Sequence, residues 1–185
     1  MEDEKIIELF FARSELAIGE LDKKYGHVCY SVSHNILNNP LDVEECVSDA
    51  YLGTWNAIPP HRPNPLLAFV CKIVRNISLE RYRTNTAMKR NSTYDIAMSE
   101  IEHSLVSPNS LEDTMDAKFL AKLIERFLDT LSEDNRVIFM RRYWFSDSYA
   151  DIAKLTGYTE KNISVRLTRI RQNLRTYLAK EGVPV

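Results

Sequence analysis

Residues 148–170 read SYADIAKLTGYTEKNISVRLTRI, and this stretch decides the fold of the C-terminal part of the chain. Ser148 is followed three residues later by Asp151, which is the spacing of a helix-capping box. This pair predicts a short helix over Tyr149–Leu155. Gly157 can adopt the left-handed backbone conformation that ends such a helix in a tight turn. The stretch therefore predicts two helices joined at a glycine.

The second predicted helix begins after Thr159, which is a suitable N-cap. Its apolar residues recur at helical spacing and form a stripe that we expect to be buried: Ile163, Leu167, Ile170 and Leu174. The opposite face carries Lys161, Ser164, Val165, Thr168 and Arg169. A short helix, a glycine turn and a longer capped helix are typical of a helix-turn-helix, whose second helix enters the major groove of DNA.

The exposed face of this second helix has chemistry suited to reading bases. Arg169 can pair with guanine, Ser164 and Thr168 can donate or accept a hydrogen bond, and Val165 can contact a thymine methyl group. Three further arginines are better placed for phosphates: Arg166, Arg171 and Arg175. The residues alone leave one alternative open, a three-helix bundle with no role in DNA binding.

The net charge of −2 is unevenly distributed. Residues 161–180 include six basic side chains and no acidic one, and residues 72–90 include six basic side chains against Glu80 alone. Acidic side chains gather instead in 42–49 and 95–116. This segregation predicts two cationic surfaces for nucleic acid and separate acidic surfaces for a protein partner. Ordinary solvated helix faces are the alternative.

Helical periodicity dominates the whole chain, so we expect an all-α fold of two small domains joined by a flexible linker, with the helix-turn-helix in the second. Three N-terminal helical segments are expected: one over about 6–37, one capped by Asp42 that ends near Trp55, and one that starts at Leu66. Four prolines make 58–65 a stiff loop. The expected domains are 1–84 and 113–185, and the linker, 85–112, holds at most a short helix around 95–101.

Composition excludes several classes of protein. With 44% hydrophobic and 27% charged residues, the chain is of the globular class, and no apolar run approaches the roughly 18 residues of a membrane span. The acidic N-terminus does not resemble a secretory signal, so we expect a cytoplasmic protein without a membrane partner. Cys29, Cys46 and Cys71 are expected as reduced core thiols. Because no metal-ligand spacing or catalytic histidine arrangement is present, we expect no metal, cofactor or enzyme activity.

Three stretches near the C-terminus resemble the C-terminal domain of sigma-70-type RNA polymerase sigma factors: LSEDNRVIFMRRY (131–143), SYADIA (148–153) and ISVRLTRIR (163–171). In that family this domain reads the −35 promoter element. The resemblance, taken with the exposed helix face, implies the following −35 contacts: Lys161, Ser164, Val165, Arg166, Thr168, Arg169 and Arg171.

The N-terminal half shows the same resemblance independently. DVEECVSDAYLGTW (42–55) is similar to the family segment that docks on the polymerase clamp helices, and FVCKIVRNISLERYR (69–83) is similar to the helix that binds the −10 element. The first match implies polymerase contacts at Asp42, Glu44, Glu45 and Asp49. The second places Asn76 at an extruded base and Lys72, Arg75 and Arg83 near the strand backbone, with Arg62 and Asn64 of the proline loop as walls of the base pocket.

The order of these segments resembles the extracytoplasmic-function (ECF) group of sigma factors, which keeps only these two domains. The resemblance implies a non-enzymatic transcription initiation factor with core RNA polymerase and promoter DNA as partners, and, by family analogy, an anti-sigma factor. Two other classes match the sequence less well. A response regulator or one-component repressor requires a phosphoacceptor or ligand domain, and the N-terminal half lacks strand-helix alternation. A nuclease requires carboxylates beside a basic face, and here the two kinds of cluster are separated.

Overall fold

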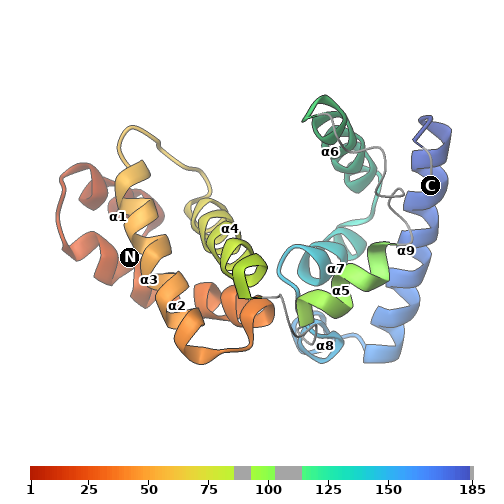
Figure 1. Cartoon of the computed structure of the whole chain (residues 1–185), viewed down its shortest axis with the longest axis horizontal. Coiled ribbons are helices and arrows are strands. Elements are labelled where there is room, and N and C mark those ends of the chain that lie inside the picture. The colour runs from red at the N-terminus through yellow and green to blue at the C-terminus, as the bar shows by residue number, and fades with distance from the viewer. Residues whose placement is uncertain (86–92, 103–113, 184–185) are drawn as a thin grey trace. The chain divides into compact units, whose positions relative to one another are not determined.

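The computed structural model describes residues 1–85, 93–102 and 114–183, and within these ranges every regular element is a helix (Figure 1). The chain divides into two compact units, Met1–Ser92 and Thr93–Val185. The prediction of an all-α chain with two helical domains is confirmed. Most of the predicted linker, 85–112, lies outside the described residues.

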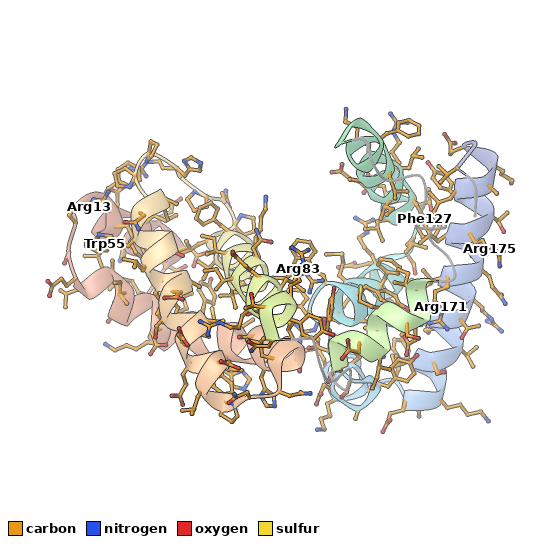
Figure 2. The ribbon with its side chains drawn as sticks, viewed as in Figure 1. Arg13, Trp55, Arg83, Phe127, Arg171 and Arg175 are labelled. Atoms are coloured by element: carbon orange, nitrogen blue, oxygen red, sulfur yellow. The ribbon has the colours of Figure 1, made fainter. Side chains whose placement is uncertain are left out.

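The first unit contains α1 (Asp3–Phe11), α2 (Leu16–Leu37), α3 (Pro40–Ala57) and α4 (Leu66–Asn85). The single helical segment expected over 6–37 is in fact two helices, because the backbone of Arg13 adopts a positive φ of 53° between them. The Arg13 guanidinium donates a hydrogen bond of 2.6 Å to the carbonyl of Trp55 near the end of α3, and it lies 5.3 Å from the Trp55 ring centroid (Figure 2).

Helix α3 begins earlier than its capping pattern predicted. Asn39, rather than Asp42, is the N-cap, and its side chain accepts a hydrogen bond of 3.1 Å from the backbone N–H of Leu41. Pro40 occupies the first helical turn, where its missing N–H costs nothing. Asp42 therefore lies inside the first turn, where a carboxylate is favourable to the helix dipole.

Helices α2, α3 and α4 pack against one another and enclose the core of the first unit. Cys29, Cys46 and Cys71 are free thiols buried in that core, as the sequence predicted. The contact with Cys71 and burial raise the pKa of Cys29, and burial raises the pKa of Cys46. Both thiols therefore stay protonated at neutral pH.

The second unit contains α5 (Thr93–Glu102), α6 (Thr114–Asp129), α7 (Glu133–Tyr143), α8 (Tyr149–Thr156) and α9 (Glu160–Lys180). Its core collects apolar side chains from all five helices, including Leu123 of α6, Ile138 of α7 and Ile152 of α8, each with no exposed area. Helix α5, which falls in the predicted linker, belongs to this core through Ala97 and Ile101. Val137 of α7 is 39% exposed, because α7 turns Ile138 and Phe139 inward.

Candidate nucleic-acid interface

Local hydrogen bonds fix the helix-turn-helix in the way that the sequence predicted. The Ser148 Oγ accepts a hydrogen bond of 3.2 Å from the backbone N–H of Asp151, and the Ser148 hydroxyl in turn donates to the Asp151 carboxylate. This second bond holds the pKa of Asp151 below its ordinary value. Gly157 adopts a φ of 75°, and Thr159 caps α9 by accepting a hydrogen bond of 3.2 Å from the backbone N–H of Asn162.

The two faces of α9 divide as expected. The predicted apolar stripe is buried: Ile163, Leu167 and Leu174 have no exposed area, and Ile170 is 2% exposed. On the opposite face Lys161, Thr168 and Arg169 are exposed, Val165 is 43% exposed, and Ser164 is half-buried. The burial of one face against α7 and α8 leaves the other as an exposed ridge that can enter a groove of DNA.

Arg166 and Arg169 of this helix differ in how firmly they are held. Arg166 donates hydrogen bonds to Asn162 Oδ1 (2.7 Å) and to Asn135 Oδ1 of α7 (2.9 Å), and its guanidinium lies 4.3 Å from the ring centroid of Tyr158. Arg169 makes no hydrogen bond or ion pair with any residue that the structure describes. Arg166 therefore connects α9 to α7, whereas Arg169 is available for a ligand.

Arg166 and Arg169 also border a groove of about 390 Å³ beside the exposed ridge. Its other lining residues come from the turn before α7, from α7 itself and from α9: Leu131, Asn135, Asn162, Val165, Ile170 and Asn173. The groove thus combines two guanidinium groups with three amide side chains, all of which can donate hydrogen bonds. The sequence did not predict Asn135 as part of this surface, because it lies on another helix.

Arg171, which the sequence assigned to a phosphate among the −35 contacts, does not lie on the exposed ridge. Its side chain is only 18% exposed. It donates to the Tyr143 hydroxyl (2.8 Å) and to Thr168 Oγ1 (3.1 Å), and it lies 3.5 Å from Glu100 Oε2. Two residues beyond Arg169 correspond to a rotation of about 200° around the helix, which turns Arg171 toward α7. Figure 2 labels it below Arg175 on α9.

In the first unit, α4 presents a basic stripe. Lys72, Asn76 and Arg83 are exposed, and their spacings of four and seven residues place them on one side of the helix (Figure 2 labels Arg83). Arg75 does not belong to this stripe, contrary to expectation. It is 8% exposed, because one residue before Asn76 corresponds to a rotation of about 100° into the packed face of α4.

The proline-rich loop carries Arg62 and Asn64, both exposed. Arg62 pairs with Glu8 of α1 (2.7 Å), and its guanidinium lies 4.4 Å from the Phe11 ring centroid. Both loop residues line a cavity of about 510 Å³ with Glu2, Asp3 and Glu4. The surroundings of these two residues are therefore acidic, which the sequence did not predict.

The four acidic residues of α3 fall into two pairs. Arg81 of α4 pairs with Glu45 (2.6 Å) and lies 3.7 Å from Asp42, which also accepts a hydrogen bond of 3.0 Å from Asn85. Glu44 and Asp49 are exposed, and neither forms an ion pair with a described residue. Two apolar side chains of the same helix are also exposed, Leu41 at 76% and Leu52 at 56%. The surface of α3 is thus both acidic and apolar.

The described parts of the chain also bear on metal binding and on membrane insertion. No group of three or more His, Cys, Asp or Glu side chains there could hold a metal ion. Within the same residues, no helix has the length and apolar content needed to cross a membrane.

Comparison with known proteins places both units in one family. Residues 21–88 match the family described as Sigma-70 region 2, and residues 121–174 match Sigma-70, region 4. Together the two matches cover about two thirds of the chain. The first match contains α3 and α4 with their exposed acidic and basic residues, and the second contains α7, α8 and most of α9.

A relative and a solved structure were also found. The chain is 23% identical over 166 residues to the ECF RNA polymerase sigma factor SigE of Mycolicibacterium smegmatis, in an alignment that covers 88% of this chain and 62% of that protein. It is 18% identical to a chain in the structure of CnrH in complex with the cytosolic domain of CnrY, with a TM-score of 0.45 and coverage of 96% and 97%. The chain belongs to the sigma-70 family of RNA polymerase sigma factors.

Proposed function

We propose that this chain is a transcription initiation factor that binds core RNA polymerase and directs it to promoters by reading −10 and −35 elements. One observation carries the proposal: each of the two matched regions presents an exposed helix face with cationic and amide side chains, α4 in the first unit and α9 in the second. Two separate faces of this kind suit two separate DNA elements. The polymerase supplies the chemistry of RNA synthesis, so this chain contributes binding alone.

The −35 element is assigned to the exposed ridge of α9. Arg169 is its best candidate for base recognition, because it is exposed and has no partner among the described residues. Lys161, Val165 and Thr168 lie on the same ridge. Arg166 is held by Asn135 and Asn162 and is suited to a phosphate at the edge of the groove.

The −10 element is assigned to α4 and the proline loop. Asn76 can hydrogen-bond the edge of an extruded base, and Lys72 and Arg83 on the same stripe can neutralise the adjacent phosphates. Because Arg75 is buried, it is no longer part of this proposal. Arg62 reaches the DNA only by giving up its exposed ion pair with Glu8, which costs little because exposed pairs contribute little stability.

Core polymerase is assigned to α3. Glu44 and Asp49 are exposed carboxylates without an internal partner, so they can pair with basic side chains of the polymerase. The exposed Leu52 adds apolar contact area. Asp42 and Glu45 are engaged by Arg81, so their contribution is to hold α3 against α4. By family analogy, the proposal includes a cytoplasmic location and an inhibitory anti-sigma partner.

The test is transcription in vitro with core RNA polymerase on a genomic library, followed by mapping of the start sites. We expect transcripts from a small set of promoters that share −10 and −35 sequences, and weak binding of duplex promoter DNA by the protein alone. No transcript from any promoter would reject the proposal. Tight binding to one operator without polymerase would instead favour a repressor.

A further inference from the structure

The carboxylate of Glu100, on α5, lies at the centre of a cluster of hydrogen-bond donors in the second unit. It accepts two hydrogen bonds from Arg142 (2.7 and 3.0 Å) and one from the Tyr149 hydroxyl (3.0 Å). Arg171 and the Tyr143 hydroxyl each lie 3.5 Å from Glu100 Oε2. Arg142 is only 3% exposed. These four side chains form an anion-binding site, and α5 supplies the anion.

The donors are held in place by groups other than α5. Arg142 also donates to the carbonyl of Asp147 (2.7 Å), and its guanidinium lies 4.8 Å from the Tyr149 ring centroid. Arg171 is fixed by the Tyr143 hydroxyl and by Thr168. Burial raises the pKa of Tyr143 to about 12, so its hydroxyl stays protonated. Each arginine therefore retains at least one hydrogen-bond partner outside α5 when Glu100 leaves.

Helix α5 itself is weakly attached. It has ten residues, which is too short for stable helix formation alone, so its docking holds it in shape. Ala97 and Ile101 of α5 are buried in the core and Met98 packs against it, while Ile96 is 56% exposed. Its sequence, TYDIAMSEIE, has three acidic residues and no basic one. A short acidic helix whose carboxylate binds two arginines can compete with an external anion for those arginines.

The position of the site indicates which anion competes. Tyr149 begins α8, whose N-terminus carries a partial positive charge, and Thr168, which contacts Arg171, lies on the exposed ridge of α9. We propose that the site accepts a phosphate of duplex DNA, and that α5 inhibits DNA binding by the free protein until it is displaced. This inference rests on the proposed DNA binding by the second unit. It adds a phosphate contact and the helix, α5, that controls access to it.

The first experiment uses the unaltered protein. Hydrogen exchange of the α5 amides is measured alone and with a saturating short duplex of arbitrary sequence at low salt. We expect α5 to be protected in the free protein and to exchange faster with DNA, while α8 and α9 become more protected. Unchanged or increased protection of α5 at saturation would overturn the inference. Loss of α5 protection with core polymerase alone, but not with DNA, would also overturn it, because the site would then take a protein carboxylate.

The second experiment removes the internal anion. Glu100→Gln should raise affinity for the same duplex about tenfold, the effect of one charged hydrogen-bonded contact, and should steepen the salt dependence by roughly one phosphate. The matched control Glu125→Gln removes an exposed carboxylate of α6, and it should not raise the affinity for the duplex to the same degree. Adding Arg171→Gln to Glu100→Gln should abolish the gain.

Equal affinities of Glu100→Gln and Glu125→Gln for DNA would refute the inference, as would a gain that persists with Arg171→Gln. Circular dichroism checks that each variant is folded. If Glu100→Gln unfolds, the exchange measurement on the unaltered protein decides alone. Because the duplex has an arbitrary sequence, these results do not depend on transcription. Failure of the proposed promoter function would appear separately, as absence of transcript with core polymerase.

Discussion

Arg166 and Arg169 are three residues apart on α9, and replacing each with alanine should have opposite consequences for stability and DNA specificity. Arg166 bridges α9 to α7 through Asn135, whereas Arg169 has no protein partner among the described residues. The two substitutions remove the same type of side chain from the same helix. Differences between the two variants therefore report on local contacts and not on charge or helix propensity.

The structure gives the expected loss of stability. Arg166 loses a cation–π contact with Tyr158, worth about 0.5–1 kcal/mol at an exposed site, and two side-chain hydrogen bonds, each worth roughly 0.5–1.5 kcal/mol. Because these contacts share one half-buried side chain and are not additive, we expect Arg166→Ala to lower the free energy of unfolding by about 1–2 kcal/mol. Arg169→Ala should change it by less than about 0.5 kcal/mol.

For DNA specificity the expected order reverses, and Arg169→Ala has the larger effect. A bidentate contact between an arginine and guanine discriminates by about 1–3 kcal/mol, so Arg169→Ala should reduce transcription from promoters with the preferred base by roughly 5- to 150-fold. The preference at that one position should disappear. Arg166→Ala should weaken all promoters to a similar degree, because a phosphate contact carries no base information.

Urea denaturation followed by circular dichroism measures stability, and transcription from a library randomised in the −35 element measures specificity. Lys180→Ala, which removes an exposed charge at the end of α9, is the control for net charge. Loss of preference at a single base in Arg166→Ala, with an unchanged profile in Arg169→Ala, would refute the assignment. So would equal destabilisation by the two substitutions.

Three further predictions concern the other parts of the structure. Asn76→Ala should reduce promoter opening, measured by permanganate reactivity, with little change in core binding; a loss of core binding would contradict the placement of the −10 helix. Ser148→Ala should lower the free energy of unfolding by about 1 kcal/mol at neutral pH, as measured by urea denaturation. Since the Ser148 hydroxyl lowers the pKa of Asp151, this stabilisation is present above the ordinary pKa of 3.8 and should fade as pH falls through the lower folded value. Leu167→Ala should destabilise the second unit by about 2–5 kcal/mol. The fluorescence of Trp144 measures this unfolding, and the unfolding reported by the tryptophan of the first unit should not change.

The helix-turn-helix could be predicted from sequence because its determinants are local. The cap at Ser148, the turn at Gly157 and the cap at Thr159 each act over three or four residues, and a buried stripe is visible from spacing alone. The same local rules were less accurate at α3, where Asp42 and Asn39 both have capping side chains and the proline after Asn39 decides between them.

The roles of individual arginines could not be predicted in the same way. Whether Arg142 is buried depends on Glu100, 42 residues away in sequence, because a charge enters the core only when it is paired. Arg171 is oriented by the same carboxylate and by Tyr143. These contacts are long-range, and they connect a segment expected as linker to the helix-turn-helix. Rotation around the helix alone indicates that Arg75 and Arg171 point away from the exposed faces of their helices, but it does not reveal the partners of Arg171.

Some of the cationic side chains predicted to contact DNA are engaged within the protein, and others are exposed without a described partner. This difference affects how strongly the proposed factor binds DNA. Of the sequence-predicted DNA contacts, several cations are engaged within the protein or buried: Arg62, Arg75, Arg166 and Arg171. The exposed cations without a partner among the described residues are Lys72, Arg83, Lys161, Arg169 and Arg175. Because affinity for DNA depends steeply on the number of phosphates neutralised, we expect two such cations on the first unit and three on the second to give weak binding. In the proposed function, polymerase holds both units on one promoter, which makes the second contact intramolecular and multiplies the affinity without adding charge. We therefore expect specificity to require both elements together, and we expect the free protein, with its net charge of −2, to bind other DNA weakly.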